Sequence, residues 1–295
     1  MSETLRTINI LDNNVISDRD VISSNAVRSV CVNQINGSYA VVEPLGSDGS
    51  YNGRVVVYPQ SIKLELPLEI KTLDEVGSLY YPQDAKFDYY GNSLWIADTG
   101  NDRVLKVDLK TNKVDFTVSS IVYPHAISIN HSEGGAFIKG YTDYNMVTGI
   151  VSYIRRDSTE VVNFMFNDND IENSSSSSSD SSASNSSFSG VSSSSSSSMN
   201  IFPIFPSVKS MFYDSVRSRI WWVSGVRVYM ADIRNKQVKT YNITNDLYYA
   251  TYAINVELAT GNAFVVASNI HNERFLLQIN RDNSELLGSA YVGVI

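Results

Sequence analysis

A unit of three short strands, Tyr81–Leu109, recurs along the chain and limits the folds that this sequence can adopt. One apolar run ends at Phe87, a second spans Leu94–Ala97, and Arg103–Leu109 alternates between apolar and polar residues, as a half-buried strand does. The two turns between the strands are rich in Asn, Asp and Gly, residues that tolerate left-handed backbone or bond their own main chain. The unit therefore predicts antiparallel β-structure built from short hairpins.

The repetition can be followed residue by residue. Arg227–Val238 aligns without a gap to Arg103–Val114, and both segments begin Arg-Val, with Asp at the sixth place and Val at the twelfth. Two further matches pair Arg219–Val223 with Ser93–Ala97, and Tyr123–Asn130 with Tyr81–Asp88. An architecture that stacks similar units explains these matches, whereas a β-sandwich or two stacked β domains, the alternatives, would not require them.

Five such units lie near residues 27–66, 82–118, 124–166, 206–244 and 249–294. Four short strands at a period of about 40 residues are typical of a β-propeller blade. We therefore predict an all-β fold, a propeller of five four-stranded blades. A sixth blade could come from the N-terminal arm together with the Gly46–Gly53 region.

Two segments fall outside the blades. Residues 1–25 are polar and irregular, broken by Asn13-Asn14, and are predicted to form an N-terminal arm before a propeller spanning 26–295. A low-complexity loop, 167–200, interrupts the propeller, and 19 of the 25 residues from Ser174 to Ser198 are serine. Such a segment buries too little apolar area to offset the entropy of ordering, so we predict a disordered insertion.

The turn and strand sequences resemble the NHL repeat of β-propeller proteins. Pro82–Ala85, Trp95–Val104 and Lys106–Asp108 carry the resemblance, which is good over one unit and weaker in the others. NHL propellers usually have six blades, and the family includes protein- and RNA-binding modules, a metal-using lyase and domains of virion proteins. The resemblance therefore implies a fold and leaves the function open.

Composition restricts the partners and the compartment. The formal net charge is −8 without any basic block, which disfavours a nucleic-acid partner because such partners need clustered Lys and Arg. The one cysteine, Cys31, lies in an alternating apolar run and is expected to be a buried core thiol. The first residues lack the apolar segment of a secretory signal, and no apolar run approaches the ~18 residues of a membrane helix. We expect cytoplasmic synthesis, no membrane partner and incorporation into a virion.

No catalytic or cofactor-binding motif is recognisable. The three histidines, His125, His131 and His271, are predicted to lie at different radii of the propeller, too far apart to form a zinc site. Asp168, Asp170 and Glu172 resemble a calcium loop, but without its glycine and its last glutamate, so we predict no metal and no cofactor.

Three polar side chains recur at matching turns and are expected to serve the scaffold. Asp98 is predicted to bond the backbone of its own turn rather than to act as a general base, and Arg103 and Arg227 to brace strands or blades.

Tyrosine is unusually frequent, at 18 residues. Tyrosines at loop edges are large, rigid and amphipathic, which suits protein interfaces. The candidate interaction residues are Tyr81, Tyr90, His125, Tyr141, Tyr144 and Tyr249.

These patterns indicate a non-enzymatic structural or protein-interaction module that binds other protein subunits in a larger assembly, such as a phage or virus particle. One alternative is an NHL-like hydrolase or lyase with its site in the central channel, and a second is an RNA-binding propeller.

Deletion of Ser174–Ser198 is predicted to leave the protein folded. The tract lies between two units, and shortening a flexible loop changes stability by only about 0.6 kcal/mol per halving of its length. Thermal melting and assembly should be followed together. A melting temperature lowered by more than about 10 °C would show that the serines pack in the fold. Normal melting with failed assembly would place a partner contact in the loop.

Overall fold

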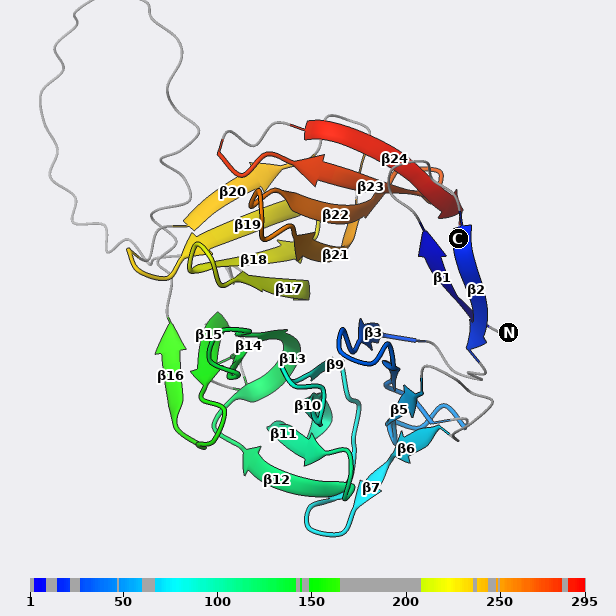
Figure 1. The fold of residues 1–295 in the computed structure, drawn as a ribbon, viewed down its shortest axis with the longest axis vertical. Coiled ribbons are helices and arrows are strands. Elements are labelled where there is room, and N and C mark those ends of the chain that lie inside the picture. The colour runs from blue at the N-terminus through cyan, green and yellow to red at the C-terminus, as the bar shows by residue number, and fades with distance from the viewer. Residues whose placement is uncertain are drawn as a thin grey trace, which may run out of the picture.

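The computed structural model describes residues 3–8, 15–21, 27–46, 48–59, 67–141, 144, 149–164, 208–235, 238–243, 248, 250–282 and 286–294. Five four-stranded antiparallel sheets stand around a common centre as the blades of a propeller (Figure 1). One three-residue 3-10 helix, η1 (Thr99–Asn101), is the helical structure in these ranges. The predicted all-β propeller of five blades is confirmed.

The blades follow one another in chain order, each with its first strand innermost. Blade 1 contains β3 (Ser29–Val32), β4 (Tyr39–Glu43), β5 (Arg54–Tyr58) and β6 (Leu68–Ile70). Blade 2 contains β9 (Asp84–Phe87), β10 (Ser93–Asp98), β11 (Arg103–Asp108) and β12 (Lys113–Val118). Blade 3 contains β13 (Val122–Ile129), β14 (Ala136–Tyr141), β15 (Gly149–Ile154) and β16 (Val161–Phe164).

The other two blades are built in the same way. Blade 4 contains β17 (Val208–Asp214), β18 (Arg219–Ser224), β19 (Arg227–Asp232) and β20 (Val238–Asn242). Blade 5 contains β21 (Ala250–Val256), β22 (Ala263–Ser268), β23 (Glu273–Ile279) and β24 (Leu286–Val294). Two hairpins stand apart from the blades: β1 (Glu3–Ile8) with β2 (Val15–Val21), and β7 (Thr72–Leu73) with β8 (Gly77–Ser78).

Three details differ from the sequence-based expectation or lie beyond it. The N-terminal arm contains a two-stranded hairpin, because strands form on both sides of the Asn13-Asn14 break. Residues 60–66 lie outside the described residues, and the fourth strand of blade 1 is β6, which pairs with β5 directly after Pro67. The serine-rich insertion also lies outside the described residues, in the connection from β16 to β17.

Apolar side chains form a core between successive blades. Blades 1 and 2 share one cluster, blades 2 and 3 a second, blades 3 and 4 a third, and blades 4 and 5 a fourth. The middle strands are buried on both faces, and Trp95, Trp221 and Trp222 are at most 1% exposed. A blade is therefore stabilised mainly by its neighbours, since each sheet has two apolar faces to remove from water.

Polar side chains on the inner strands tie each blade to the next. The Oδ2 of Asp84 accepts the amide N–H of Ile127 at 2.8 Å, across the junction of blades 2 and 3. Ser128 Oγ accepts the N–H of Tyr213 at 2.7 Å across the next junction. Ser210 Oγ accepts the N–H of Ile254 at 3.3 Å across the one after. These bonds satisfy amides at blade edges that would otherwise lack a partner.

Asp84 also binds toward blade 1. Its Oδ1 accepts the Ser29 hydroxyl at 2.5 Å and the Lys86 ammonium at 2.6 Å. This one carboxylate therefore links three consecutive blades, and its burial is compensated by the charge of Lys86.

Asp98 has the predicted scaffold role, but its bonds reach beyond its own turn. The carboxylate is fully buried and accepts the Tyr80 amide at 2.7 Å, the Asn101 side chain at 2.8 Å and Arg103 Nε at 2.6 Å. Arg103 continues the network by donating to the carbonyls of Val76 and Ser78, so its predicted bracing role is confirmed. Arg227 is different: it is exposed, and Ser224 occupies the position that Asp98 has in blade 2, so the predicted brace is absent there.

Asp98→Ala should destabilise the fold by about 3 kcal/mol, because it leaves the Arg103 guanidinium and the Tyr80 amide without their acceptor. Asp108→Ala is the matched control. Among the described residues, Asp108 accepts from Lys110 and Thr111 of its own turn, so its loss should cost about 1 kcal/mol or less. Urea denaturation of both variants tests this expectation, and equal losses would contradict the cross-connection role of Asp98.

Candidate functional site

The inner strands run parallel to one another around the ring, and this defines two faces. Hydrogen bonds between blades 1 and 2 pair Arg28 with Gln83, Ser29 with Asp84, and Asn33 with Gly91. The residue numbers rise together along the two inner strands, so these strands run in the same direction. We call the end at which the inner strands begin the top face and the opposite end the bottom face. Because strands within a blade are antiparallel, the loop between the second and third strands also lies on the top face.

A cluster of three tyrosines forms on the top face at blades 1 and 2. Tyr51, in the β4–β5 loop, lies with its ring centroid 5.7 Å from that of Tyr80 and 5.2 Å from that of Tyr81. The exposed fractions of the three are 53%, 41% and 36%. Their backbones are joined as well, because the Tyr81 amide donates to the Tyr51 carbonyl at 2.7 Å. The result is an exposed aromatic cluster on a fixed backbone.

A second cluster lies one blade further on. The Tyr123 and Tyr144 ring centroids are 6.0 Å apart with the rings edge to face, and Tyr144 is 66% exposed. The Tyr123 amide donates to Asp102 Oδ1 at 2.8 Å, which anchors this connection to the loop of blade 2. The two clusters therefore sit at equivalent places in successive blades.

Both clusters depend on a Tyr-Pro step with unusual backbone geometry. Tyr81 has φ of 51° and Tyr123 has φ of 44°, in the left-handed region that is unfavourable for side chains other than Gly and Asn. Such conformations cost on the order of 1–3 kcal/mol and persist where neighbouring bonds fix them. Here the fixing bonds are the two amide contacts to the preceding blade.

His125 and Tyr141 lie next to the second cluster, near the top ends of β13 and β14. Their ring centroids are 5.5 Å apart, and His125 Nδ1 donates to the Tyr123 carbonyl at 2.6 Å. Within the described part of the chain, the enclosed Nε2 has no hydrogen-bond partner. Burial, with the Lys139 charge as a second cause, lowers the pKa of His125 to about 4. The imidazole is therefore neutral at pH 7.

Three of the six predicted interaction residues thus gather at one place, His125, Tyr141 and Tyr144, and Tyr81 lies in the neighbouring cluster. Tyr141 is only 7% exposed and serves the packing there. Tyr90 lies on the bottom face, in the β9–β10 turn, with the Arg156 guanidinium 4.5 Å from its ring centroid. Tyr249 lies outside the described residues.

Tyr51, Tyr80 and Tyr123 were not among the predicted interaction residues. The Tyr-Pro phrase shared by Tyr81-Pro82 and Tyr123-Pro124 is the signal that could have found Tyr123. Tyr51 is 30 positions from its partner Tyr81, so only the fold brings the two together.

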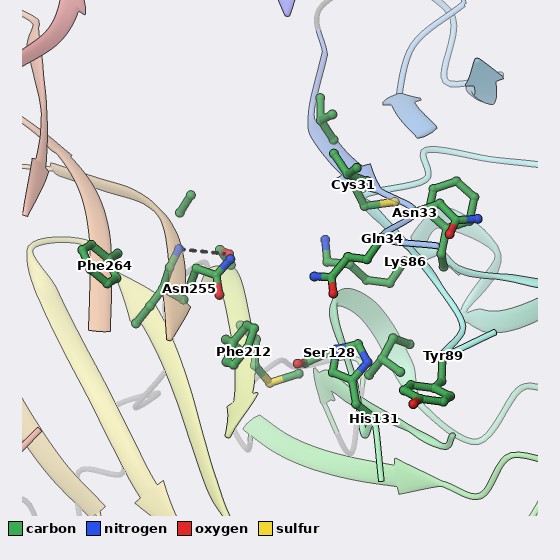
Figure 2. A pocket seen from close by; sticks show the side chains of 18 of the residues that line it. Cys31, Asn33, Gln34, Lys86, Tyr89, Ser128, His131, Phe212, Asn255 and Phe264 are labelled. Carbon is green, nitrogen blue, oxygen red and sulfur yellow. Dashed lines mark hydrogen bonds between the residues drawn. The ribbon is translucent and has the colours of Figure 1, made fainter. Parts of the chain in front are cut away.

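The central channel holds a cavity of about 470 Å³ lined by all five inner strands. Figure 2 shows Lys86 and Gln34 projecting into it from blades 2 and 1, with Ser128 and His131 below them and Phe212, Asn255 and Phe264 on the opposite wall. Cys31 also lines the cavity, and burial raises the pKa of its thiol to about 11, so the thiol is protonated at neutral pH. Lys86 is paired with Asp84.

The histidines occupy separate places. His125 lies near the top end of β13, His131 lines the channel cavity with its ring centroid 6.1 Å from that of Tyr89, and His271 lies in the exposed β22–β23 turn. Among the residues with described positions, no group of three or more His, Cys, Asp or Glu side chains is arranged to hold a metal ion. Asp168, Asp170 and Glu172 are outside those positions.

Comparison with known proteins identifies the fold. A chain in the crystal structure of a nidogen/laminin complex is similar with a TM-score of 0.63 and 12% identity, covering 98% of this chain and 90% of that one. A hydrazine synthase chain from Kuenenia stuttgartiensis has a TM-score of 0.48 and 9% identity, covering 71% of this chain and 48% of that one. No protein-family model and no curated protein matches the sequence. The fold is a β-propeller, and the NHL resemblance stays a sequence-level prediction.

In the described ranges, no helix has the length and apolar character needed to cross a bilayer.

His125→Gln should weaken the acid sensitivity of the fold. Between pH 6.5 and about 4, His125 is protonated in the unfolded protein but stays neutral in the folded protein, because burial lowers its pKa. The wild-type free energy of unfolding therefore falls as the pH is lowered through this window. The shift corresponds to at most about 3 kcal/mol. Urea denaturation from pH 7.5 to 4 measures it, with His271→Gln in an exposed turn as the control. Identical pH profiles for the two variants would contradict the burial of His125.

Proposed function

We propose that this chain is a non-enzymatic protein-binding propeller, and that its top face binds another protein subunit of a larger assembly. One observation carries the proposal: two clusters of exposed tyrosines stand on fixed backbone at equivalent places of neighbouring blades. Tyrosines with this exposure and rigidity contribute large contact area at low entropic cost.

The loop geometry supports this use. The backbone at Tyr81 and Tyr123 is held in a strained conformation by bonds to the preceding blade. Strain of this kind is found at sites where side chains are presented to a ligand. A preformed aromatic surface also avoids the ordering cost that a flexible loop would incur on binding.

The channel chemistry favours a binding role over catalysis. Cys31 has a raised pKa and is a poor nucleophile at neutral pH, and Lys86 is neutralised by Asp84. Membership of an NHL-like propeller family and incorporation into a phage or virus particle belong to the same proposal. They are supported by the Trp95–Val104 motif and by the polar, tyrosine-rich composition.

The proposal is tested by the native mass of the protein purified from its natural source. The wild type should run as a complex heavier than the 32.7 kDa chain. Tyr51→Ser combined with Tyr144→Ser should lose the complex while keeping the melting temperature, because both side chains are more than half exposed.

Tyr90→Ser, on the bottom face and 47% exposed, is the matched control and should keep the complex. Loss of the complex in the control and not in the double variant would place the interface on the wrong face. A wild type found only as a monomer would refute the assembly role.

A further inference from the structure

The inner strand of each blade begins with an irregularity at the top face. In blade 1, the Arg28 amide donates to the Val42 carbonyl at 2.8 Å, although Val42 already lies opposite Ser29 in the sheet. Two residues of one strand therefore face one residue of the next, which is the arrangement of a β-bulge. A bulge re-aims a side chain out of the regular alternation of the strand.

The other four blades carry the irregularity at the same place. In blade 2, Gln83 and Asp84 both lie opposite Ala97. In blades 3, 4 and 5, the register of the inner strand shifts at its top end. We call the residues directly before the regular pairing begins, one from each blade, the rim residues. They are Arg28, Gln83, His125, Lys209 and Tyr252.

The rim residues stand at the top end of the central channel. Figure 1 shows the five inner strands, β3, β9, β13, β17 and β21, around the common centre. Residues further along these strands line the channel cavity. Arg28 Nε donates to Gln83 Oε1 at 2.7 Å, and Lys209 Nζ lies 4.4 Å from the centroid of the Tyr252 ring. Every rim side chain carries an N–H or O–H group, and none is a carboxylate.

The rim cations lack the carboxylate partners that other cations of the fold have. Arg54, Arg103 and Arg217 each lie within 3.1 Å of a carboxylate oxygen. Within the described ranges, Arg28 and Lys209 form no ion pair. Because the chain as a whole has a net charge of −8, these unpaired cations make the rim a locally positive site on an acidic protein.

Arg274 adds a third cation on blade 5. It lies opposite Ser268 near the start of β23, and its Cζ is 4.9 Å from the Tyr252 ring centroid. Among the described residues, its enclosed Nε has no acceptor, and the enclosed Nε2 of Gln83, a residue only 8% exposed, has no partner either. Buried donors without acceptors indicate a network that an ion or ligand completes.

The carboxylate nearest to the rim along the chain does not complete this network. Asp84 follows Gln83 directly, but its oxygens are taken by Lys86, by the Ser29 hydroxyl and by the Ile127 amide of the next blade. The missing acceptor is therefore expected from outside the described part of the chain.

The arrangement suits an extended acidic peptide better than a compact phosphate. Phosphate sites are commonly built from clustered backbone N–H groups. At the rim, Arg28 and Gln83 donate their amides within their own blades, so side chains are left as donors. These donors come from separate blades, and a segment with several carboxylates can reach more than one of them.

We propose that the rim of the channel binds a carboxylate-rich segment of the partner subunit. This inference rests on the proposed function and adds the chemistry of the partner. Arg28 with Gln83 takes one carboxylate, and Lys209 with Arg274 takes another. The tyrosine clusters lie on the same face, so aromatic and ionic contacts belong to one interface.

Binding of a fluorescein-labelled decaglutamate peptide, measured by fluorescence anisotropy at low ionic strength, tests the rim without the partner. The wild type should bind, and Arg28→Gln with Lys209→Gln should weaken binding about tenfold. Lys110→Gln with Arg155→Gln removes the same charge from exposed turns on the bottom face and should leave the affinity unchanged. Absence of wild-type binding, or equal losses in the two double variants, would overturn the proposal.

Two further measurements keep the test decisive. If the double variant is unstable, Arg28→Gln alone, at an exposed position, should still weaken binding several-fold, and an unchanged affinity would overturn the proposal. Inorganic phosphate in excess, at constant ionic strength, should leave the peptide bound. Full displacement by phosphate would assign the rim to a small anion and would overturn the peptide assignment.

The native-mass experiment separates this inference from the proposed function. Arg28→Gln with Lys209→Gln should lose the complex, as the Tyr51→Ser, Tyr144→Ser variant does. A complex that is lost in the tyrosine variant but persists in the rim variant would overturn the inference and leave the proposed function standing.

Discussion

Each blade of this propeller can bury its two apolar faces only against other blades, and this constraint governs the rest of the structure. Where two blades meet, side chains from both form a core, and an inner-strand oxygen accepts an amide of the following blade. Asp84 makes more of these links than Ser128 or Ser210, because its two oxygens bind blades on both sides. Among the described residues, the first and last blades each share a core with only one other blade.

The same stacking determines which parts of the chain are available for binding. Most side chains of the middle strands are buried in the cores, whereas the top loops connect strands and anchor the next blade. Tyr51 anchors the Tyr81 connection through its carbonyl, and Asp102 anchors the Tyr123 connection through its carboxylate. A loop fixed in this way exposes its aromatic rings in one conformation, so binding a partner costs little additional conformational entropy. This links the architecture to the proposed binding of a protein subunit.

Much of the fold could be predicted from sequence because it is local and repeated. Alternating apolar residues and turn residues within one unit predict the strands from Asp84 to Val118. The gapless match of Arg103–Val114 to Arg227–Val238 predicts the corresponding strand of blade 4. The scaffold role of Asp98 followed from its turn, but its bond to Tyr80 did not, since that amide belongs to a connection 18 residues away.

The candidate site was less predictable because it is assembled from different blades. Tyr81 and Tyr144 were predicted as single residues at loop edges, but their partners Tyr51 and Tyr123 depend on which loops become neighbours. The alignment also misled at Arg227: the match to Arg103 is correct for the strand, but the carboxylate that gives Arg103 its role is replaced by Ser224. A repeat predicts positions well and predicts contacts only where both partners recur.

Native-state hydrogen exchange, resolved by strand, tests the account most directly. The middle blades 2, 3 and 4 each share two cores, whereas blades 1 and 5 share one with another blade. The account predicts that amides of β10, β14 and β18 exchange only when the whole protein unfolds. Amides of β4 and β22 should exchange through partial opening, at a lower free energy. Equal protection of β4, β22 and the middle blades would contradict an account in which blade stability depends on the number of shared cores.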